Sequence, residues 1–329
     1  MSECPWEILK IPKGKVPLGP ARGDEGIEPT FVSKIVMLFE IIHRTDYHYG
    51  QPASEAYIEA RLTPPKLAGQ SVERHDLRFD PTSAVSTYRD FFDNAVTVFS
   101  MTLRHKQLSL VNSSLIRTRE VSPPADALAV RVAEARQLFT SRLSDVFIYL
   151  QPTPVVPIGL AAKDWARKCC PGETPLGEAL EALNQIIYKK FRYDSEATDA
   201  STPLAKVWKQ RSGVCQDFAH IMLSVLRTAG LPARYVCGYI ESDPVRPTPG
   251  ESKKLVGSLA THAWVEVLTP GMTWIALDPT NNQWCGPRHV TMSYGRDASD
   301  AAPVRGTFKG SGAQNMTVKV TMKRQPEPT

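Results

Sequence analysis

The chain has 329 residues, of which 42% are hydrophobic and 22% are charged, and its formal net charge is +5. This composition predicts a folded protein with a sizeable core and excludes a largely disordered chain. The basic residues are scattered and form no run with interleaved aromatics, so we expect no nucleic-acid partner. The longest apolar run, residues 35–42, is too short to cross a membrane, so we expect no membrane partner.

The cysteines indicate neither a zinc site nor a disulfide framework. No CxxC pair occurs among the six cysteines, and the first twenty residues lack the apolar segment of a secretory signal. We therefore expect reduced thiols, a cytoplasmic location and no metal site.

The first part of the chain predicts an extended arm followed by β-structure. Residues 1–33 are rich in Pro and Gly and show no periodicity, which favours an N-terminal arm. Residues 34–122 contain segments such as "SEAYIEARL" and "AVTVFSMTL", whose composition is typical of strands. Their short connections predict antiparallel pairing, and hence a β-rich N-terminal module.

Helices and then strands follow along the chain. Residues 125–141 and 176–194 place apolar side chains at helical spacing, as does a third segment that ends at Gly230, a natural residue after a helix C-terminus. The strand patterns "ARYVCGYI", "THAWVEV" and "WIALDP" come next. This order predicts an α+β core over residues 123–300, with a helical layer packed on an antiparallel sheet. Residues 301–329 predict one further strand, "NMTVKVTM", and a tail.

A cysteine lies where the third predicted helix begins, in "RSGVCQDFAHIM". With Ser212 as N-cap, Cys215 falls at position N3, where unpaired backbone N–H groups and the helix dipole favour a thiolate. The same groups would stabilise negative charge that develops on a carbonyl oxygen. The simpler interpretation is that Cys215 is a small buried core residue. A nucleophilic cysteine would also need a base nearby.

Two strands supply a candidate base and its partner. In "THAWVEV", His262 shares one strand face with Trp264, and Asp278 ends the next strand just before a proline. A carboxylate in that place would fix the tautomer and orientation of His262. The simpler alternatives are a core histidine and an aspartate that caps a turn.

The connection between these strands decides whether the two side chains can meet. If "TPG" forms a three-residue loop, His262 lies directly opposite Asp278, whereas a two- or four-residue turn places them on opposite faces of the sheet. If Asp278 orients His262, the loop at Gly271 must therefore have an odd length or contain a bulge.

These blocks resemble a known family. "GVCQDFAHIMLSVLRTAGLPARYVCGYI" and "THAWVEVLTPGMTWIALDPTNNQ" resemble the catalytic core of the transglutaminase-like superfamily. "IHRTDYHYGQPASEAYIEARLTPP" is similar to the β-rich N-terminal module of its bacterial branch, and the resemblance extends from about residue 35 to residue 322. It implies a papain-like cysteine core in which Cys215, His262 and Asp278 form a triad.

The resemblance also implies the chemistry, which is acyl transfer on an amide or peptide bond of a protein or peptide substrate. Cys215 would form a thioester, His262 would protonate the departing amine, and no metal or cofactor is needed. Tyr193 and Trp264 are candidate oxyanion or cleft residues. Residues 242–260 are rich in Pro, Gly and Lys and are expected to form a loop over the site.

Hydrolysis is the expected outcome, because water reaches an open site while amine transfer needs an acceptor site or the exclusion of water. A protein-glutamine transglutaminase that uses an amine acceptor is the first alternative. The second is a non-catalytic binding or assembly protein on the same fold. The sequence leaves the substrate and the oligomeric state open.

Overall fold

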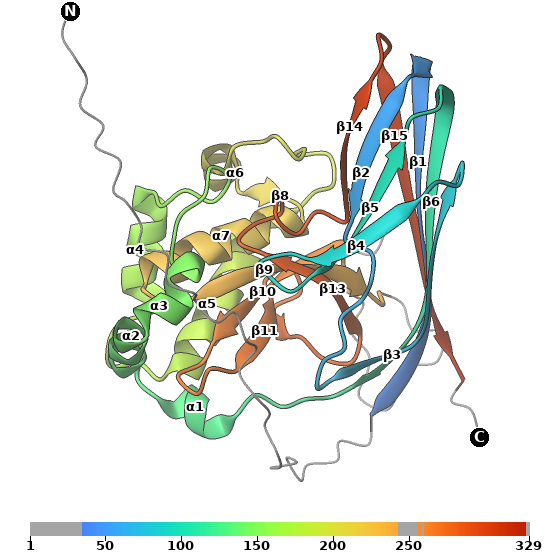
Figure 1. Ribbon diagram of the computed structural model, residues 1–329. Coiled ribbons are helices and arrows are strands. Elements are labelled where there is room, and N and C mark those ends of the chain that lie inside the picture. Colours follow the sequence, from blue (N-terminus) through green and yellow to red (C-terminus); the bar gives the residue numbers. More distant parts are fainter. Residues whose placement is uncertain (1–34, 243–254, 258–259, 327–329) are drawn as a thin grey trace, which may run out of the picture. The chain divides into compact units, whose positions relative to one another are not determined.

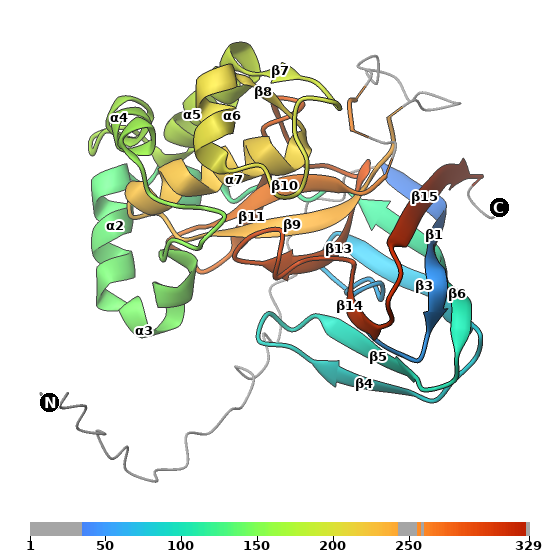
Figure 2. The same ribbon diagram turned by 90° about the horizontal axis from the view of Figure 1, so that it is seen from above.

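The computed structural model describes residues 35–242, 255–257 and 260–326, and combines antiparallel sheets with a layer of helices (Figures 1 and 2). These residues belong to one compact unit, Ser33–Thr329. The predicted arm, and most of the predicted loop over residues 242–260, lie outside the described residues.

The β-rich module consists of two four-stranded sheets whose neighbouring strands are antiparallel. The first has the order β15 (Gln314–Gln325), β1 (Val36–Ala53), β6 (His105–Arg119) and β3 (Gln70–Asp80). The second has the order β14 (Val304–Lys309), β2 (Glu55–Ala60), β5 (Ala95–Met101) and β4 (Val85–Arg89). Alternate residues of β1, β2, β5 and β6 are largely buried between the sheets, where the rings of Phe79 and Phe99 stack at 4.6 Å.

The core sheet has five antiparallel strands in the order β12, β11, β10, β9 and β13. Their bounds are β12 (Gln283–Trp284), β11 (Trp274–Asp278), β10 (His262–Leu268), β9 (Ala233–Ile240) and β13 (His289–Gly295). The helical layer comprises α1 (Ala125–Ala129), α2 (Val132–Ser141), α3 (Leu143–Val146), the short 3-10 helix η1 (Phe147–Tyr149), α4 (Leu160–Cys169), α5 (Leu176–Lys190), α6 (Leu204–Gln210) and α7 (Cys215–Thr228). The predicted α+β class, with a helical layer on an antiparallel sheet, is confirmed.

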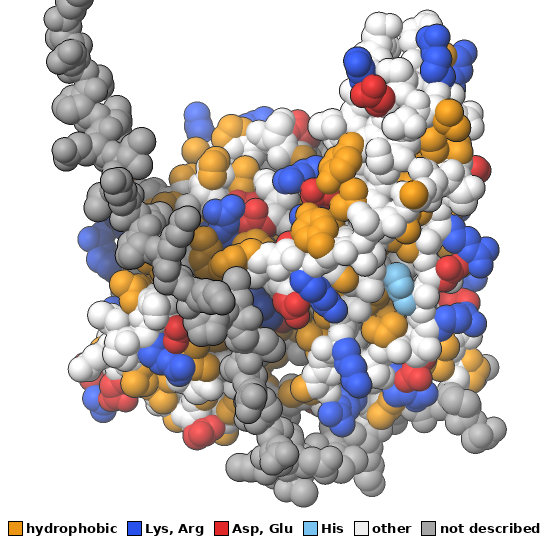
Figure 3. Space-filling model, in the orientation of Figure 1, with side chains coloured by type: hydrophobic (Ala, Val, Ile, Leu, Met, Phe, Trp, Pro, Cys, Tyr) orange, Lys and Arg blue, Asp and Glu red, His pale blue; other side chains and the backbone are white. Residues whose placement is uncertain are grey.

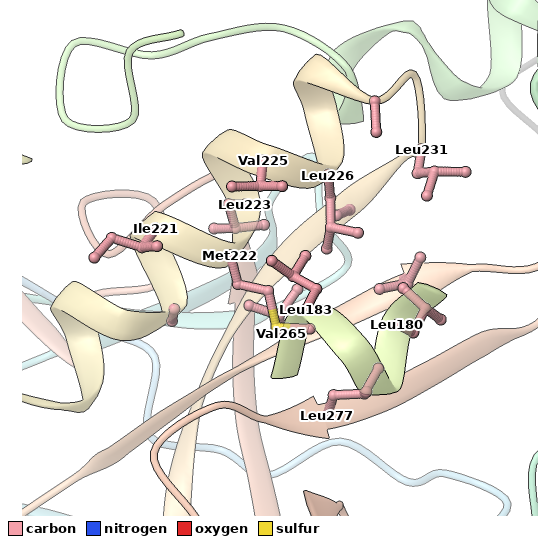
Figure 4. Close-up of a cluster of buried hydrophobic side chains, with 14 of the residues drawn as sticks. Leu180, Leu183, Ile221, Met222, Leu223, Val225, Leu226, Leu231, Val265 and Leu277 are labelled. Atoms are coloured by element: carbon pink, nitrogen blue, oxygen red, sulfur yellow. The ribbon is translucent and has the colours of Figure 1, made fainter. Parts of the chain in front are cut away.

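Helix α7 is the central element of the helical layer. Its side chains Met222 and Leu226 lie among Leu180 and Leu183 of α5 and Val265 of the sheet (Figure 4), and all five are fully buried. Truncation of such a leucine to alanine typically costs about 2–5 kcal/mol, so this cluster fixes α7 on the sheet.

The C-terminal end of α7 follows the prediction. Gly230 has φ +73°, its N–H bonds to Arg227 O at 3.0 Å, and the Leu231 N–H bonds to Leu226 O at 2.9 Å. This is the double hydrogen bond of a Schellman motif, which requires a left-handed residue after the last turn.

Two predicted elements differ from the structure. Residues 125–141 form two helices rather than one, because Val130 and Arg131 adopt extended backbone and Val130 O accepts the Leu176 N–H. The segment after residue 300 contributes two strands instead of one. Both strands pair with strands from the beginning of the chain, β14 with β2 and β15 with β1.

Two side-chain amides of the β-rich module bind the outer edge of β13. Gln70 donates to Thr291 O at 2.9 Å and accepts the Thr291 N–H at 2.8 Å. Asn94 makes the same pair of bonds with Tyr294, both at 2.8 Å. The module therefore satisfies backbone groups that an edge strand would otherwise leave unpaired.

A buried histidine adds a further contact between the module and the core. His43 Nδ1 of β1 lies 2.8 Å from the hydroxyl of Tyr239 on β9, and burial lowers the pKa of His43 to about 4. On the face drawn in Figure 3, basic and acidic side chains are interspersed. Within the described ranges, no helix has the length and apolar character that a membrane span needs.

Candidate active site

The start of α7 positions the cysteine. The helix begins at Cys215 with Val214 as N-cap, while Ser212 and Gly213 form the short strand β8, which pairs in parallel with β7 (Arg192–Tyr193). The prediction that Ser212 caps the helix is therefore wrong, and Cys215 is at N1 rather than N3. Ser212 does not cap the helix, because the Val214 N–H that its side chain would accept bonds to Asp217 instead.

The capping role belongs instead to Asp217, inside the first turn. Its Oδ2 accepts the Val214 N–H at 2.8 Å and the Thr198 hydroxyl at 2.6 Å. A Cβ at Gly213 would lie 2.5 Å from the same oxygen, so only glycine permits this close approach. Asp217 thus stabilises the helix start from its third residue and holds the chain just before Cys215.

Cys215 combines limited exposure with the electropositive end of a long helix. Its side chain is 8% exposed. The first intrahelical bond of this turn runs from the Phe218 N–H to Val214 O at 3.2 Å, so the N–H groups of Cys215 and Gln216 have no carbonyl partner within the helix. These groups and the helix dipole stabilise negative charge on, or near, the sulfur.

Tyr193 lies close to this point. It pairs with Gly213 across the two-stranded β7–β8 ladder, and its ring packs edge-on against Phe218 at 6.4 Å. Burial and the nearby charge of Cys215 raise the pKa of Tyr193 to about 12, so the hydroxyl keeps its proton and is able to donate. The structure therefore places this predicted residue beside the cysteine.

The β10–β11 connection brings His262 and Asp278 together. Leu268 pairs with Trp274, and the Thr269 N–H bonds to Thr273 O at 2.9 Å, so residues 270–272 form the loop. The predicted odd length is confirmed, but the register is shifted, and the residue with positive φ is Met272 rather than Gly271.

This register makes His262 and Asp278 diagonal neighbours on one face of the sheet rather than directly opposite residues. His262 Nε2 nevertheless lies 2.9 Å from Asp278 Oδ2, because the histidine side chain is long enough to reach a diagonal neighbour. The two residues are 1% and 0% exposed, so the contact is shielded from water.

Asp278 is the most heavily hydrogen-bonded group of the site. Its Oδ2 lies 2.9 Å from His262 Nε2 and 3.2 Å from His289 Nε2, and it accepts the Asn281 side-chain amide at 2.7 Å. Its Oδ1 accepts the backbone N–H groups of Thr280 at 2.9 Å and Asn281 at 3.2 Å. Burial alone would raise the pKa of Asp278, but the charge of His262 and the bonds from both imidazoles hold it well below its usual range.

His262 interacts with both the Asp278 carboxylate and the Cys215 thiol. Burial lowers its pKa, but the Asp278 charge, followed by the charge and hydrogen bonding of Cys215, raises the pKa of His262 to about 10. No bond of standard geometry joins Nδ1 to another group in the described ranges. Because Nε2 faces Asp278, Nδ1 is the nitrogen left for the cysteine, and catalytic hydrogen bonds are often long before substrate binds.

Trp264 packs inside the protein. It is 1% exposed, and its ring lies 5.3 Å from that of His289 and 6.2 Å from that of His262. In this structure Trp264 therefore supports the two imidazoles from within instead of lining an open surface. No group of three or more metal-ligating side chains occurs in the part of the chain that the structure describes.

Several site residues escaped the sequence analysis. Asn281 lies in the quoted "DPTNN" block, so its position was visible, but its bonds to Asp278 and to the Val256 backbone were not. Gly257 has φ +107° and packs directly against the His262 ring. His289 gave no local signal, because only the long-range arrangement of β11 and β13 brings it to the carboxylate.

Comparisons with known proteins identify the family of this chain. One family model, the transglutaminase-like superfamily, matches residues 163–279, and another, the bacterial transglutaminase-like N-terminal region, matches residues 39–117. An uncharacterized protein of Mycobacterium tuberculosis, Rv2569c, is 34% identical over 301 residues, which cover 88% of this chain and 92% of that protein. The chain belongs to the transglutaminase-like superfamily.

A shorter sequence match and a structural match extend the comparison. A protein-glutamine gamma-glutamyltransferase of Pseudomonas aeruginosa is 43% identical over 107 residues, which are 30% of this chain and 16% of that protein. The crystal structure of a "putative cysteine protease" from Cytophaga hutchinsonii superposes with TM-score 0.65 at 20% identity, over 90% of this chain and 93% of that one. This second likeness shows the shared fold.

Proposed function

We propose that this chain is a cysteine-dependent acyl-transfer enzyme that acts on amide or peptide bonds of a protein or peptide substrate. Cys215 is the nucleophile, His262 the general acid and base, and Asp278 the carboxylate that orients the imidazole. The contact that carries the proposal is the fully buried 2.9 Å bond between His262 and Asp278, beside a thiol at a helix N-terminus.

The reaction proceeds in two balanced halves. His262 is protonated at neutral pH and holds this proton beside Cys215, whose sulfur bonds to the carbonyl carbon as a thiolate. The C–N bond then breaks, and His262 gives this proton to the departing amine, which leaves a thioester. In the second half, His262 takes a proton from the acceptor while the acceptor bonds to the carbonyl carbon. The C–S bond then breaks, which releases the product and restores the Cys215 thiolate beside protonated His262.

The oxyanion of each half lies near the start of α7. The backbone N–H of Cys215 is one donor, because the first turn leaves it without an intrahelical partner. Tyr193 is the candidate second donor, since its hydroxyl stays protonated beside Cys215.

We favour water as the acceptor, which makes the enzyme a cysteine peptidase or amidase. Amine transfer would need a dedicated acceptor site or exclusion of water. Transglutamination is the second candidate. It is favoured by the 43% identity between a 107-residue segment and the Pseudomonas aeruginosa gamma-glutamyltransferase.

Mass spectrometry on a glutamine-containing peptide library, with and without a primary amine, tests the proposal. Wild-type protein is compared with Cys215→Ala and with Cys237→Ala, a matched control in which a second buried thiol is removed. Chain cleavage or deamidation that depends on Cys215, but not on Cys237, supports hydrolysis. Amine addition with the same dependence supports transglutamination, and the absence of any Cys215-dependent product favours a binding protein on this fold.

A further inference from the structure

A second imidazole shares the carboxylate of the site. His289 is the first residue of β13 and is 7% exposed, and its Nε2 lies 3.2 Å from Asp278 Oδ2, the oxygen that also faces His262. Strands β11 and β13 are separated by β10 and β9 in the sheet, so this contact joins two strands that are not neighbours.

The surroundings of His289 define its tautomer. The Gly286 N–H donates to Nδ1 at 3.3 Å, so Nδ1 carries a lone pair and the ring proton of the neutral imidazole is on Nε2. This proton points at Asp278, and the Trp264 ring packs edge-on against His289 at 5.3 Å and limits its rotation. The geometry is that of a fixed donor.

The two imidazoles are held in different states. Burial lowers the pKa of His289, and the charges of His262 and Arg288 lower it further, while the bond to Asp278 and the charge of that carboxylate raise it in part. The pKa of His262, by contrast, is raised to about 10. At neutral pH the same oxygen therefore accepts from one charged and one neutral ring.

We propose that His289 is a positioning residue that acts through Asp278: its neutral Nε2–H fixes Oδ2 toward His262 and so sets the reactivity of Cys215. The inference rests on the proposed function, because it assigns His289 a part in that same site. Without this donor, Oδ2 keeps only the Asn281 amide as a second partner, and the carboxylate is freer to turn away from His262.

Alkylation of Cys215 by iodoacetamide tests the inference without a known substrate. The rate is followed by mass spectrometry from pH 5 to 9 in the wild type, His289→Leu and His289→Gln. His43→Leu is the matched control, because it removes a buried histidine with a hydrogen bond to Tyr239 and no contact with the site. Circular dichroism confirms that each variant is folded.

We expect His289→Leu to lower the rate at pH 7 about tenfold or more, as for loss of a hydrogen bond to a charged group, and to move the pH profile upward. In His289→Gln, the side-chain amide is able to donate to Asp278, so the alkylation rate should stay within about threefold of the wild-type rate. The rate of the control His43→Leu should equal the wild-type rate. An unchanged rate and profile in His289→Leu would contradict the inference, as would equal losses in the leucine and glutamine variants.

The outcomes separate this inference from the proposed function. If wild-type Cys215 reacts no faster than free glutathione, both fail. If it reacts fast and His289→Leu behaves as the wild type does, only the role of His289 fails. Should His289→Leu not fold, ¹⁵N NMR of wild-type histidines decides: a neutral Nε2–H tautomer at pH 7 supports the inference, and an Nδ1–H tautomer or a charged ring overturns it.

Discussion

The core sheet carries two buried polar arrangements that differ in kind. At the end of β11, an ionised carboxylate accepts hydrogen bonds from two imidazoles, a side-chain amide and two backbone groups. At the edge strand β13, the neutral amides of Gln70 and Asn94 bind the backbone of Thr291 and Tyr294. Both are nearly shielded from water, but only the first contains charge.

The difference reflects what each arrangement has to do. Burial of a charge costs far more than burial of an amide, and only dense hydrogen bonding compensates for it. Docking of the β-rich module needs no charge, so neutral amides suffice at β13. Proton transfer does need groups that change charge, so the larger cost falls at Asp278. The two regions meet in β13, which begins with His289 and ends beside Tyr294.

Asp278→Asn removes the charge and keeps the shape, and we expect the largest effect from it. An amide at this place no longer stabilises a protonated His262, so Cys215-dependent turnover should fall about a thousandfold to ten-thousandfold, as for loss of the orienting aspartate in serine-protease triads. Turnover of the library-derived substrate measures it. Asp164→Asn, in an exposed ion pair on α4, is the control and should leave turnover unchanged.

Acid should weaken the fold through two buried histidines. Burial lowers the pKa of His43 and of His220 to about 4, whereas the unfolded chain takes up these protons near 6.5. The unfolded state therefore binds more protons between these values, and the unfolding free energy should fall as the pH drops from 6.5 to 4, by about 3 kcal/mol for each histidine.

Urea denaturation between pH 4 and pH 7 measures this slope. The variant His43→Gln should lose part of the slope, because one titrating group is gone while His220, His75 and His289, whose pKa values burial also lowers, remain. A slope that does not change in this variant would show that other groups cause the acid sensitivity.

Gln70→Leu tests the neutral arrangement. The leucine leaves the N–H and the carbonyl of Thr291 buried without their partner, which should lower the unfolding free energy by about 2 kcal/mol. Gln107→Leu, on an exposed position of β6, is the matched control and should stay within about 0.5 kcal/mol of the wild type. Equal stability of the two variants would mean that Gln70 adds nothing to docking. In folded Gln70→Leu, alkylation of Cys215 should remain at the wild-type rate.

The smallest effect is expected from Tyr193→Phe. The ring that packs on Phe218 is retained and only the hydroxyl is lost, so turnover should fall less than about tenfold if the backbone supplies most of the oxyanion stabilisation. An unchanged turnover would show that the hydroxyl is not the second oxyanion donor, and a loss of a hundredfold or more would make it the principal donor.

Local signals in the sequence predicted much of the site. The spacing places a cysteine at a helix start, a histidine on a strand, an aspartate at a strand end and a helix end at Gly230, and the structure has each of these local features. Each depends on residues close together in the chain, where spacing constrains structure.

The predictions of the α7 N-cap and of the β10–β11 register were wrong because more than one residue could form each local structure. Ser212 is a good N-cap by residue type, but Asp217 binds the Val214 N–H from inside the helix, and Ser212 lies in the short strand β8. The β10–β11 loop shifted by one residue because the Thr269–Thr273 pair closed it. His289 could not be predicted at all, because its role depends on the packing of strands that are distant in sequence.

The pairing of β1 with β15 has a consequence for how this chain folds during synthesis. Leu38 pairs with Gln325 and Tyr49 with Gln314, so β1 leaves the ribosome long before the strand with which it pairs. Core strands β9, β10 and β11 pair over much shorter stretches of chain and are able to form first. Until β15 is made, the long edge of β1 is exposed, and a nascent chain stalled before residue 314 presents it to chaperones and to aggregation.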